Sequence, residues 1–253
     1  MLRGDGMKNG IDVSKHNGDI DFQKVKAAGY DFVIIRAGFG KLVSQKDTRF
    51  EENYAKAKAA GLNVGAYWYS YALSLDEGKA EAAACLECIK NKAFEYPVYF
   101  DLEESKQFAK GKVFCSDLVK TFCGELEKAG YFAGLYTSKS ILETMIDDSV
   151  KNRFTIWCAQ WNSKCTYQGN YGIWQKSETG RINGINGNVD LDESYLDFPK
   201  TMKTLGKNGF QKTNAPTVKV QYEVAVSFDT QEEAQAFANL LKNAKIEKVV
   251  KTT

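Results

Sequence analysis

The sequence is poor in the features that mark several common classes of protein. It has only three prolines and one histidine among 253 residues, and its 34 basic and 32 acidic side chains leave a net charge of only +2. Without a basic block, the chain lacks the electrostatic signature of a nucleic-acid partner. Its longest apolar runs fall short of the roughly 20 residues that a membrane-spanning helix needs. We therefore expect no nucleic-acid partner and no membrane insertion.

Metal and organic cofactors also lack support. With the single histidine His16 and no Ser or Cys in a nucleophile-elbow setting, no catalytic triad can be built. The pair Cys85 and Cys88 would need two further ligands to hold zinc, and it lies within a helical pattern over 76–92. We therefore expect these two to be core cysteines, the six cysteines to be mostly free thiols, and the protein to use no metal or other cofactor.

Short β-rich segments alternate with helical segments from Gly10 to about Phe198, a pattern typical of a parallel β/α architecture. Eight strands are predicted, at 10–13, 32–37, 64–71, 98–103, 132–136, 155–159, 172–175 and 189–191. Helices are predicted at 21–28, 50–60, 76–92 and 116–129, whereas turn-rich links join the last three strands. The pattern indicates an irregular TIM-like β/α barrel over residues 10–204, without helices in its last third, after an N-terminal extension at 1–9.

The end of the chain has a different pattern. After a linker at 205–215, residues 216–253 predict a strand, an amphipathic helix and a second strand, which together make a small βαβ domain. Domains below about 40 residues usually need disulfides, metal or association to be stable. We therefore expect this domain to pack against another copy of itself and make the protein a homo-oligomer.

Two acids at a predicted strand end are the first candidates for catalysis. In a strand, residues i and i+2 point to the same side, so Asp101 and Glu103 should share a face at a Cα separation of roughly 6.6 Å. This spacing lies between those of retaining and inverting glycosidases and leaves the stereochemical route open. Close like charges should raise the pKa of one partner and suit it as a general acid, a role that we assign to Glu103. Taken alone, the pair is more typical of a solvated cluster at a loop mouth.

Two further acids strengthen the prediction of a site. Asp12 ends the first predicted strand, and Asp190 lies on the last one. The first and last strands of a closed barrel are neighbours, so both carboxylates should reach the mouth where Asp101 and Glu103 lie. Four converging acids are hard to explain by structure alone.

Aromatic side chains gather near the same strand ends. For any one of them, core packing is the commoner role, but tyrosines beside carboxylates suit a sugar cleft, because their rings stack on pyranose faces and their hydroxyls bond sugar oxygens. The candidate substrate-binding residues are Tyr67, Tyr69, Tyr136, Trp161 and Gln175.

Seven motifs in order give the sequence a family resemblance between about Gly10 and Phe198. They are GIDVSKHNGDIDFQKVKAAGYDFVIIRAGFG, GAYWYSYA, PVYFDLEES, YFAGLYTS, WCAQW, GIWQ and NVDLD. Together they resemble glycoside hydrolase family 25, the lysozymes of phage endolysins and bacterial autolysins. The resemblance implies an N-acetylmuramidase that cleaves the β-1,4 bond between N-acetylmuramic acid and N-acetylglucosamine in peptidoglycan.

The resemblance also assigns roles. Glu103 matches the general acid/base, and Asp101, Asp12 and Asp190 match the other active-site acids. The resemblance implies one of two routes, direct attack by water or attack assisted by the substrate's acetamido group. In the second route, Asp101 would orient that group and Tyr67 would contact it. The tail faintly resembles half of a peptidoglycan-binding domain, so wall binding stands beside oligomerisation as its role.

Three alternatives and a cellular setting complete the expectation. The alternatives are a non-catalytic peptidoglycan-binding barrel, a hydrolase of another N-acetylated glycan such as chitin, and a structural assembly protein driven by the tail. The amino terminus carries no secretory signal pattern. We therefore expect a phage endolysin made in the cytoplasm of the bacterial host and released to the cell wall through a holin, with an autolysin exported by another route as the alternative.

Overall fold

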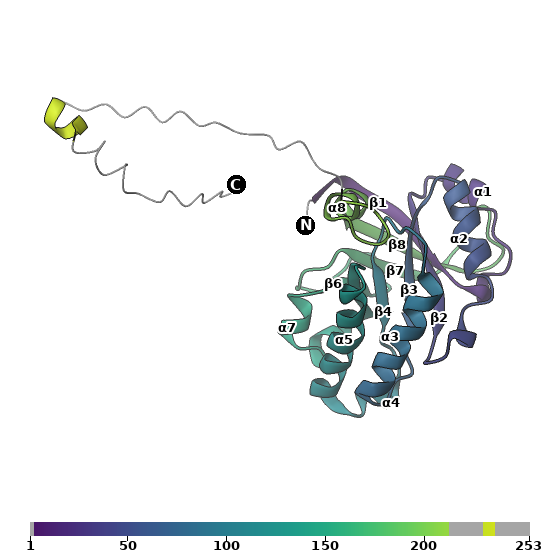
Figure 1. The fold of residues 1–253 in the computed structure, drawn as a ribbon. Coiled ribbons are helices and arrows are strands. Elements are labelled where there is room, and N and C mark those ends of the chain that lie inside the picture. Colours follow the sequence, from purple (N-terminus) through teal and green to yellow (C-terminus); the bar gives the residue numbers. More distant parts are fainter. Residues whose placement is uncertain (1–2, 213–229, 236–253) are drawn as a thin grey trace. The chain divides into compact units, whose positions relative to one another are not determined.

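A computed structural model describes residues 3–212 and 230–235. The chain divides into two compact units, residues 1–215 and 216–253. The first unit is a closed barrel whose eight strands follow one another around the ring in chain order (Figure 1). The strands are β1 (Arg3–Val13), β2 (Phe32–Phe39), β3 (Asn63–Tyr69), β4 (Val98–Asp101), β5 (Ala133–Ser138), β6 (Thr155–Ala159), β7 (Ile173–Gly180) and β8 (Val189–Leu196).

The direction of the last strand departs from the expected parallel arrangement. Neighbours from β1 to β7 are parallel, but β8 runs antiparallel to both β7 and β1. A parallel neighbour needs a crossover connection of a dozen or more residues, usually through a helix. Only a short turn-rich link joins Gly180 to Val189, so the chain reverses and β8 closes the barrel as a hairpin partner of β7.

Strand boundaries differ from the prediction in two places that matter. The first strand begins at Arg3, because Lys8 and Asn9 pair with Ser194 and Glu193 of β8, so most of the expected extension is strand. The fourth strand ends at Asp101 and does not reach Glu103.

Helices cover the outside of the barrel. They are α1 (Phe22–Ala27), α2 (Phe50–Ala59), α3 (Leu75–Ile89), α4 (Ser105–Phe108), α5 (Gly111–Lys128), α6 (Lys139–Thr144), α7 (Asp148–Lys151) and α8 (Phe198–Leu205). The prediction contains no counterpart of α4, α6, α7 or α8, of which the first three are too short to show a clear helical period. The links from β6 to β7 and from β7 to β8 carry no helix, as expected, but α8 follows β8 in the last third of the barrel, where no helix was predicted.

Alternating strand residues divide the core into two layers. Val98 and Phe100 of β4 point outward to the helices, whereas Tyr99 points inward. At the N-terminal end of the parallel strands, Phe198 and Met202 of α8 are fully buried against the inner layer and close the barrel there. The opposite end is free for a site.

All six cysteines lie in the described part of the chain, where every one of them is free and five are buried. Cys85 and Cys88 are core residues of α3, as expected. No helix in the described ranges is long and apolar enough to cross a membrane. The predicted βαβ domain lies outside the described residues except for 230–235, where residues 231–235 are helical after Thr230, whose hydroxyl accepts from Glu233 N at 3.3 Å.

Candidate active site

Acidic side chains line the inner face of the barrel at the C-terminal end of the parallel strands. Asp12 is the penultimate residue of β1, and Asp101 is the last residue of β4. Asp190 reaches the same end because β8 is antiparallel, so its second residue pairs directly with Asp12. The predicted meeting of Asp12 and Asp190 is therefore correct, although Asp190 stands at the start of its strand and not at its end.

Gln175 of β7 connects this acidic group to the aromatic residues. Its amide nitrogen donates to Asp12 Oδ2 at 2.7 Å. Its Oε1 accepts from the Tyr136 hydroxyl at 2.9 Å and from the Trp161 indole nitrogen at 3.1 Å. Because an indole N–H can only donate, these contacts fix which end of the amide faces Asp12. Gln175, Tyr136 and Trp161, three of the five predicted binding residues, thus form one hydrogen-bonded chain.

The two tyrosines predicted on β3 lie beside the acids. Tyr67 and Tyr69 are half-buried, and Tyr67 meets the inner-layer Trp157 edge to face at 6.1 Å between ring centroids. The Tyr69 hydroxyl donates to Glu104 Oε1 at 2.9 Å. All five predicted binding residues therefore come together at this end of the barrel.

Asp101 and Glu103 are neighbours in space, but not as residues of one strand. Since β4 ends at Asp101, strand alternation does not set the direction of Glu103, and the argument from a shared strand face is wrong. Leu102 is still turned to the outer core, where its N–H donates to Tyr136 O at 3.1 Å. Asp101 is 3% exposed, whereas Glu103 is exposed at the rim. Glu103 is therefore the carboxyl of this pair that can reach a large substrate.

Burial and mutual repulsion raise the pKa of every acid in the group. Burial is the main cause of the raised pKa of Asp12 and Asp101, with added repulsion from Asp192 on Asp12 and from Glu103 on Asp101. Partial loss of solvent also raises the pKa of Glu103, against a hydrogen bond from the Tyr136 hydroxyl that lowers it. Burial raises the pKa of Asp190 to about 6. For Glu103, the upward direction favours the protonated form relative to a free carboxyl, as a general acid requires.

The positive charge of Arg36 opposes the rise in the pKa of Asp101. Arg36 is an inward residue of β2, and its Nε donates to Asp47 Oδ2 at 2.8 Å. Its Nη2 is buried and has no hydrogen-bond partner among the described residues. Asp47 therefore holds Nε of the guanidinium, whereas Nη2 can still donate to a group in the site.

A buried polar network holds the turn that carries Glu103. Gln107 Nε2 donates to Ser70 Oγ at 2.9 Å and to Ala72 O at 3.1 Å, and Gln107 Oε1 accepts from Glu104 N at 3.3 Å. Ser70 Oγ in turn donates to Glu81 Oε2 at 2.6 Å. The loop after β3 and the turn after β4 are therefore tied together beneath the site.

The sequence argument missed four acids and bases of this site: Asp192, Arg36, Glu81 and Glu104. Two of them carried a usable signal. Asp192 follows Asp190 by two residues and so shares its strand face, and Arg36 interrupts an apolar strand, where a charge needs a buried partner. The network around Glu81 depends on contacts between loops, which no local pattern shows.

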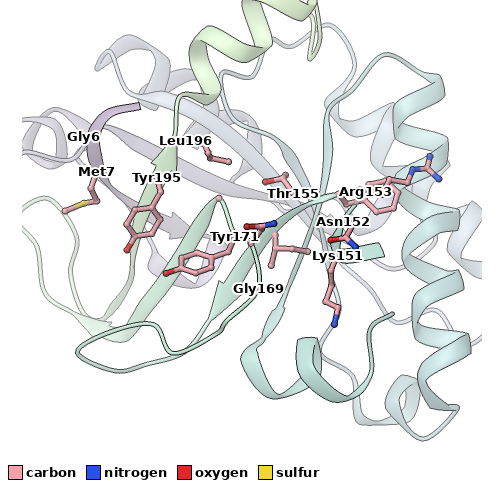
Figure 2. A pocket seen from close by; sticks show the side chains of 14 residues that line it. Gly6, Met7, Lys151, Asn152, Arg153, Thr155, Gly169, Tyr171, Tyr195 and Leu196 are labelled. Carbon is pink, nitrogen blue, oxygen red and sulfur yellow. The ribbon is translucent and has the colours of Figure 1, made fainter. Parts of the chain in front are cut away.

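A cavity of about 730 Å³ lies at the other end of the barrel, between the start of β1, the start of β6 and the end of β8. Figure 2 shows Tyr171 and Tyr195 in its wall with Met7, Thr155 and Asn152. None of the predicted site residues lines this cavity, so it is separate from the acidic site.

Comparison with known proteins agrees with the fold. Residues 11–185, more than half of the chain, match the model of glycosyl hydrolases family 25, and the chain belongs to that family. The autolytic lysozyme of Clostridium acetobutylicum is 29% identical over 185 residues, covering 73% of this chain and 55% of that protein. Lysozyme M1 of Streptomyces globisporus is 30% identical over 199 residues, covering 73% and 66%.

A solved structure extends the likeness to three dimensions. The CTP1L endolysin superposes with a TM-score of 0.69 at 25% identity, covering 78% of this chain and 69% of that one. The family resemblance inferred from the motifs is thereby confirmed. The chain spans less than two thirds of the length of both curated relatives.

Proposed function

We propose that the chain is a muramidase that hydrolyses the β-1,4 bond between N-acetylmuramic acid and N-acetylglucosamine in bacterial peptidoglycan. The observation that carries this proposal is one exposed carboxyl, Glu103, at the rim of buried carboxyls at one end of the barrel. Membership of family 25 and the relatives named as lysozymes support the choice of substrate.

Glu103 acts as general acid and then as general base. Its raised pKa favours the protonated form, which transfers a proton to the glycosidic oxygen, and the resulting carboxylate then takes a proton from the attacking water. The single Tyr136 O–H donates to Gln175 Oε1 in this structure, and a turn of that O–H towards Glu103 would bond the carboxylate form between the two steps. A proton donor that reaches the substrate is the minimum that this reaction requires.

Asp101 orients the substrate from beneath. It is 3% exposed, and its Oδ1 has no hydrogen-bond partner among the described residues. A buried acceptor without a donor is strongly unfavourable unless a ligand supplies one. The N–H of the 2-acetamido group is such a donor, and bonding it would turn the acetamido oxygen towards the anomeric carbon. Direct attack by water remains the alternative route.

The aromatic residues bind the glycan chain. The Trp161 side chain is 56% exposed, although its indole nitrogen is held by Gln175 Oε1, so its ring is fixed in place and still open to a sugar. Tyr67 and Tyr69 lie half-buried beside the acids, where their hydroxyls can bond sugar oxygens.

Digestion of purified peptidoglycan tests the proposal. We expect Glu103→Gln to lower kcat by about 10²- to 10⁴-fold, the usual contribution of general acid catalysis. Glu87→Gln, on the outer face of α3, is the matched control and should leave kcat unchanged, since its side chain is 58% exposed. Mass spectrometry should find N-acetylmuramic acid at the new reducing ends. Equal activity of Glu103→Gln and the unaltered chain, or N-acetylglucosamine at those ends, would contradict the assignment.

We also propose the setting of a phage endolysin that reaches the wall through a holin. The likeness to the CTP1L endolysin supports this setting, and the autolytic lysozyme is the competing precedent. Co-expression with a holin in the target bacterium should bring about lysis, and expression alone should not. Lysis without the holin would favour the autolysin.

For residues 216–253, we propose association between copies or binding to the wall. This tail is too short to bury much core alone. Light scattering of the full chain should give the mass of an oligomer, and a monomer that also fails to sediment with purified walls would contradict both roles.

A further inference from the structure

Asp192 is a buried acid one layer below the site. It follows Asp190 by two residues on β8, so its side chain also points inward, towards the β1 position of Gly10. Asp192 is 1% exposed, and its Oδ1 accepts from the Trp157 indole nitrogen at 2.8 Å. Its Oδ2 is buried without a hydrogen-bond partner among the described residues.

The surroundings of Asp192 carry much more negative than positive charge. The Asp12 carboxyl lies within hydrogen-bonding reach, and Asp190 is close enough to repel it. Lys176 is the cation that opposes this repulsion, but its ammonium binds Glu193 at 2.7 Å. The titratable and charged groups facing Asp192 are Asp12, Asp190, Lys176, Tyr96 and Tyr99. Two adjacent carboxylates without a buried cation cannot both stay ionised.

We propose that Asp192 is a positioning residue that carries a proton at neutral pH on Oδ2 and donates it in a hydrogen bond to the carboxylate of Asp12. The catalytic consequence rests on the proposed muramidase function, because Asp192 acts only through Asp12. A neutral Asp192 would fix Asp12 from below while Gln175 fixes it from the side.

The burial of the individual oxygens favours a proton on Asp192. Asp12 Oδ2 accepts from Gln175 Nε2 at 2.7 Å, and the amide cannot be reversed because Trp161 donates to its other end. Asp192 likewise has one donor, at Oδ1, but its Oδ2 is buried without a partner among the described residues, and neither oxygen of Asp12 is in that position. Asp192 Oδ2 is therefore the atom that gains most by carrying hydrogen. Burial and repulsion raise the pKa of both Asp12 and Asp192, so at least one proton is retained between them.

Infrared spectroscopy tests the proton directly, without any need for activity. Protonated Glu81 and Glu103 also absorb in this region at pH 7, so the test is the difference spectrum between the unaltered full chain and Asp192→Asn, in which one protonated-carboxyl band should be lost. Asp76→Asn, with a side chain that is 93% exposed, should leave the band unchanged. A band at pH 7 that Asp192→Asn does not alter would overturn the proposal even if the enzyme cleaves peptidoglycan. Loss of the band with Asp192→Asn supports it even if the chain proves inactive.

Kinetics then test the positioning role. An asparagine at 192 can accept from Trp157 and donate to Asp12, so Asp192→Asn should keep kcat within about threefold and lose less activity at alkaline pH, where a wild-type Asp192 ionises. Asp192→Ala lacks the donor and should lose at least about tenfold in kcat. If Asp192→Asn is as inactive as Asp12→Asn, Asp192 works as an anion and the proposal fails. Should Asp192→Ala not fold, the alkaline limb of Asp192→Asn still decides.

Discussion

The two walls of the site are built in opposite ways. On the first wall, Asp12 and Asp190 are directly paired residues of β1 and β8, and Gln175 Nε2 donates to Asp12 Oδ2. On the second wall, β4 ends at Asp101, and Glu103 stands beyond the strand on a turn. On the first wall Asp12 is buried and Asp190 half-buried, while the second wall presents the exposed carboxyl of Glu103.

The first wall therefore suits electrostatic stabilisation by fixed groups, whereas the second wall suits proton transfer to the substrate. Groups that stabilise developing charge work best when they are fixed in advance, which strands provide. A general acid must touch the substrate and exchange protons with it, which requires access. Asp101 belongs to both walls, since its backbone ends the strand and its side chain lies beneath Glu103. Substitutions on the two walls should therefore impair catalysis in different ways.

The largest effect after loss of Glu103 should come from Asp101→Asn. Asparagine keeps the shape but removes the charge that orients and stabilises the acetamido group, so we expect kcat to fall by about 10²- to 10³-fold with little change in KM. Steady-state cleavage of a soluble peptidoglycan fragment measures both constants. Asp117→Asn, on α5 with a side chain that is 45% exposed, is the control. A loss in kcat below tenfold would show that a fixed Asp101 carboxylate is not required.

Gln107→Ala tests whether the second wall depends on the network beneath it. Gln107 is fully buried, and its loss leaves Ala72 O and Glu104 N without their partner. We expect the free energy of unfolding to fall by about 1–3 kcal/mol and kcat to fall on the order of tenfold as the turn with Glu103 loosens. Thermal unfolding and kinetics together measure this. Gln168→Ala, at an exposed loop position, is the control, and a destabilised Gln107→Ala with unchanged kcat would separate the network from the site.

The first wall was much more predictable from sequence than the second. The end of the first strand placed Asp12 at the mouth of the barrel, and barrel closure placed Asp190 beside it. The same rules predicted Glu103 on a strand and failed, because a strand end depends on which neighbours it can pair with. β4 pairs with β3 and β5 only as far as Asp101.

The reversal of β8 was missed for a similar reason. A strand's direction depends on whether its link can cross the sheet, and a short strand pattern does not reveal this. The meeting of Asp190 with Asp12 was still correct, because the start of an antiparallel strand lies at the same end of the barrel as the ends of its parallel neighbours. Strand alternation would also have pointed to Asp192 and Arg36, whereas the contacts of Gln107 and Glu81 join the loop after β3 to α4 and α3 and follow no local pattern.

Trp161→Ala should have a smaller effect, on binding. The indole is 56% exposed, and stacking of an aromatic ring contributes about 0.5–1.5 kcal/mol, so we expect KM to rise about 2- to 10-fold with kcat almost unchanged. Trp161→Phe keeps a ring but loses the hydrogen bond to Gln175, so its KM should lie between those of the unaltered chain and Trp161→Ala. If Trp161→Ala lowers kcat more than it raises KM, the main role of the indole is to hold Gln175 against Asp12 and not to bind the glycan.

Glu81→Gln should alter the rate least and the pH dependence of stability most. Burial raises the pKa of Glu81 to about 7, although Ser70 Oγ and Tyr71 N donate to its carboxylate. Because the folded pKa lies above the unfolded value of about 4.3, the unfolded state ionises first as the pH rises. The fold therefore loses stability between about pH 4 and 7, by up to roughly 3 kcal/mol.

The glutamine cannot ionise, so this part of the loss should disappear in the variant. We expect the melting temperature of Glu81→Gln to fall less than that of the unaltered chain between pH 5 and pH 8, as measured by calorimetry. Glu87→Gln, on the exposed side of the same helix, should follow the unaltered chain. Equal slopes for Glu81→Gln and the unaltered chain would mean that Glu81 is ionised throughout this range. The network beneath the second wall would then contain a buried, ionised Glu81 carboxylate.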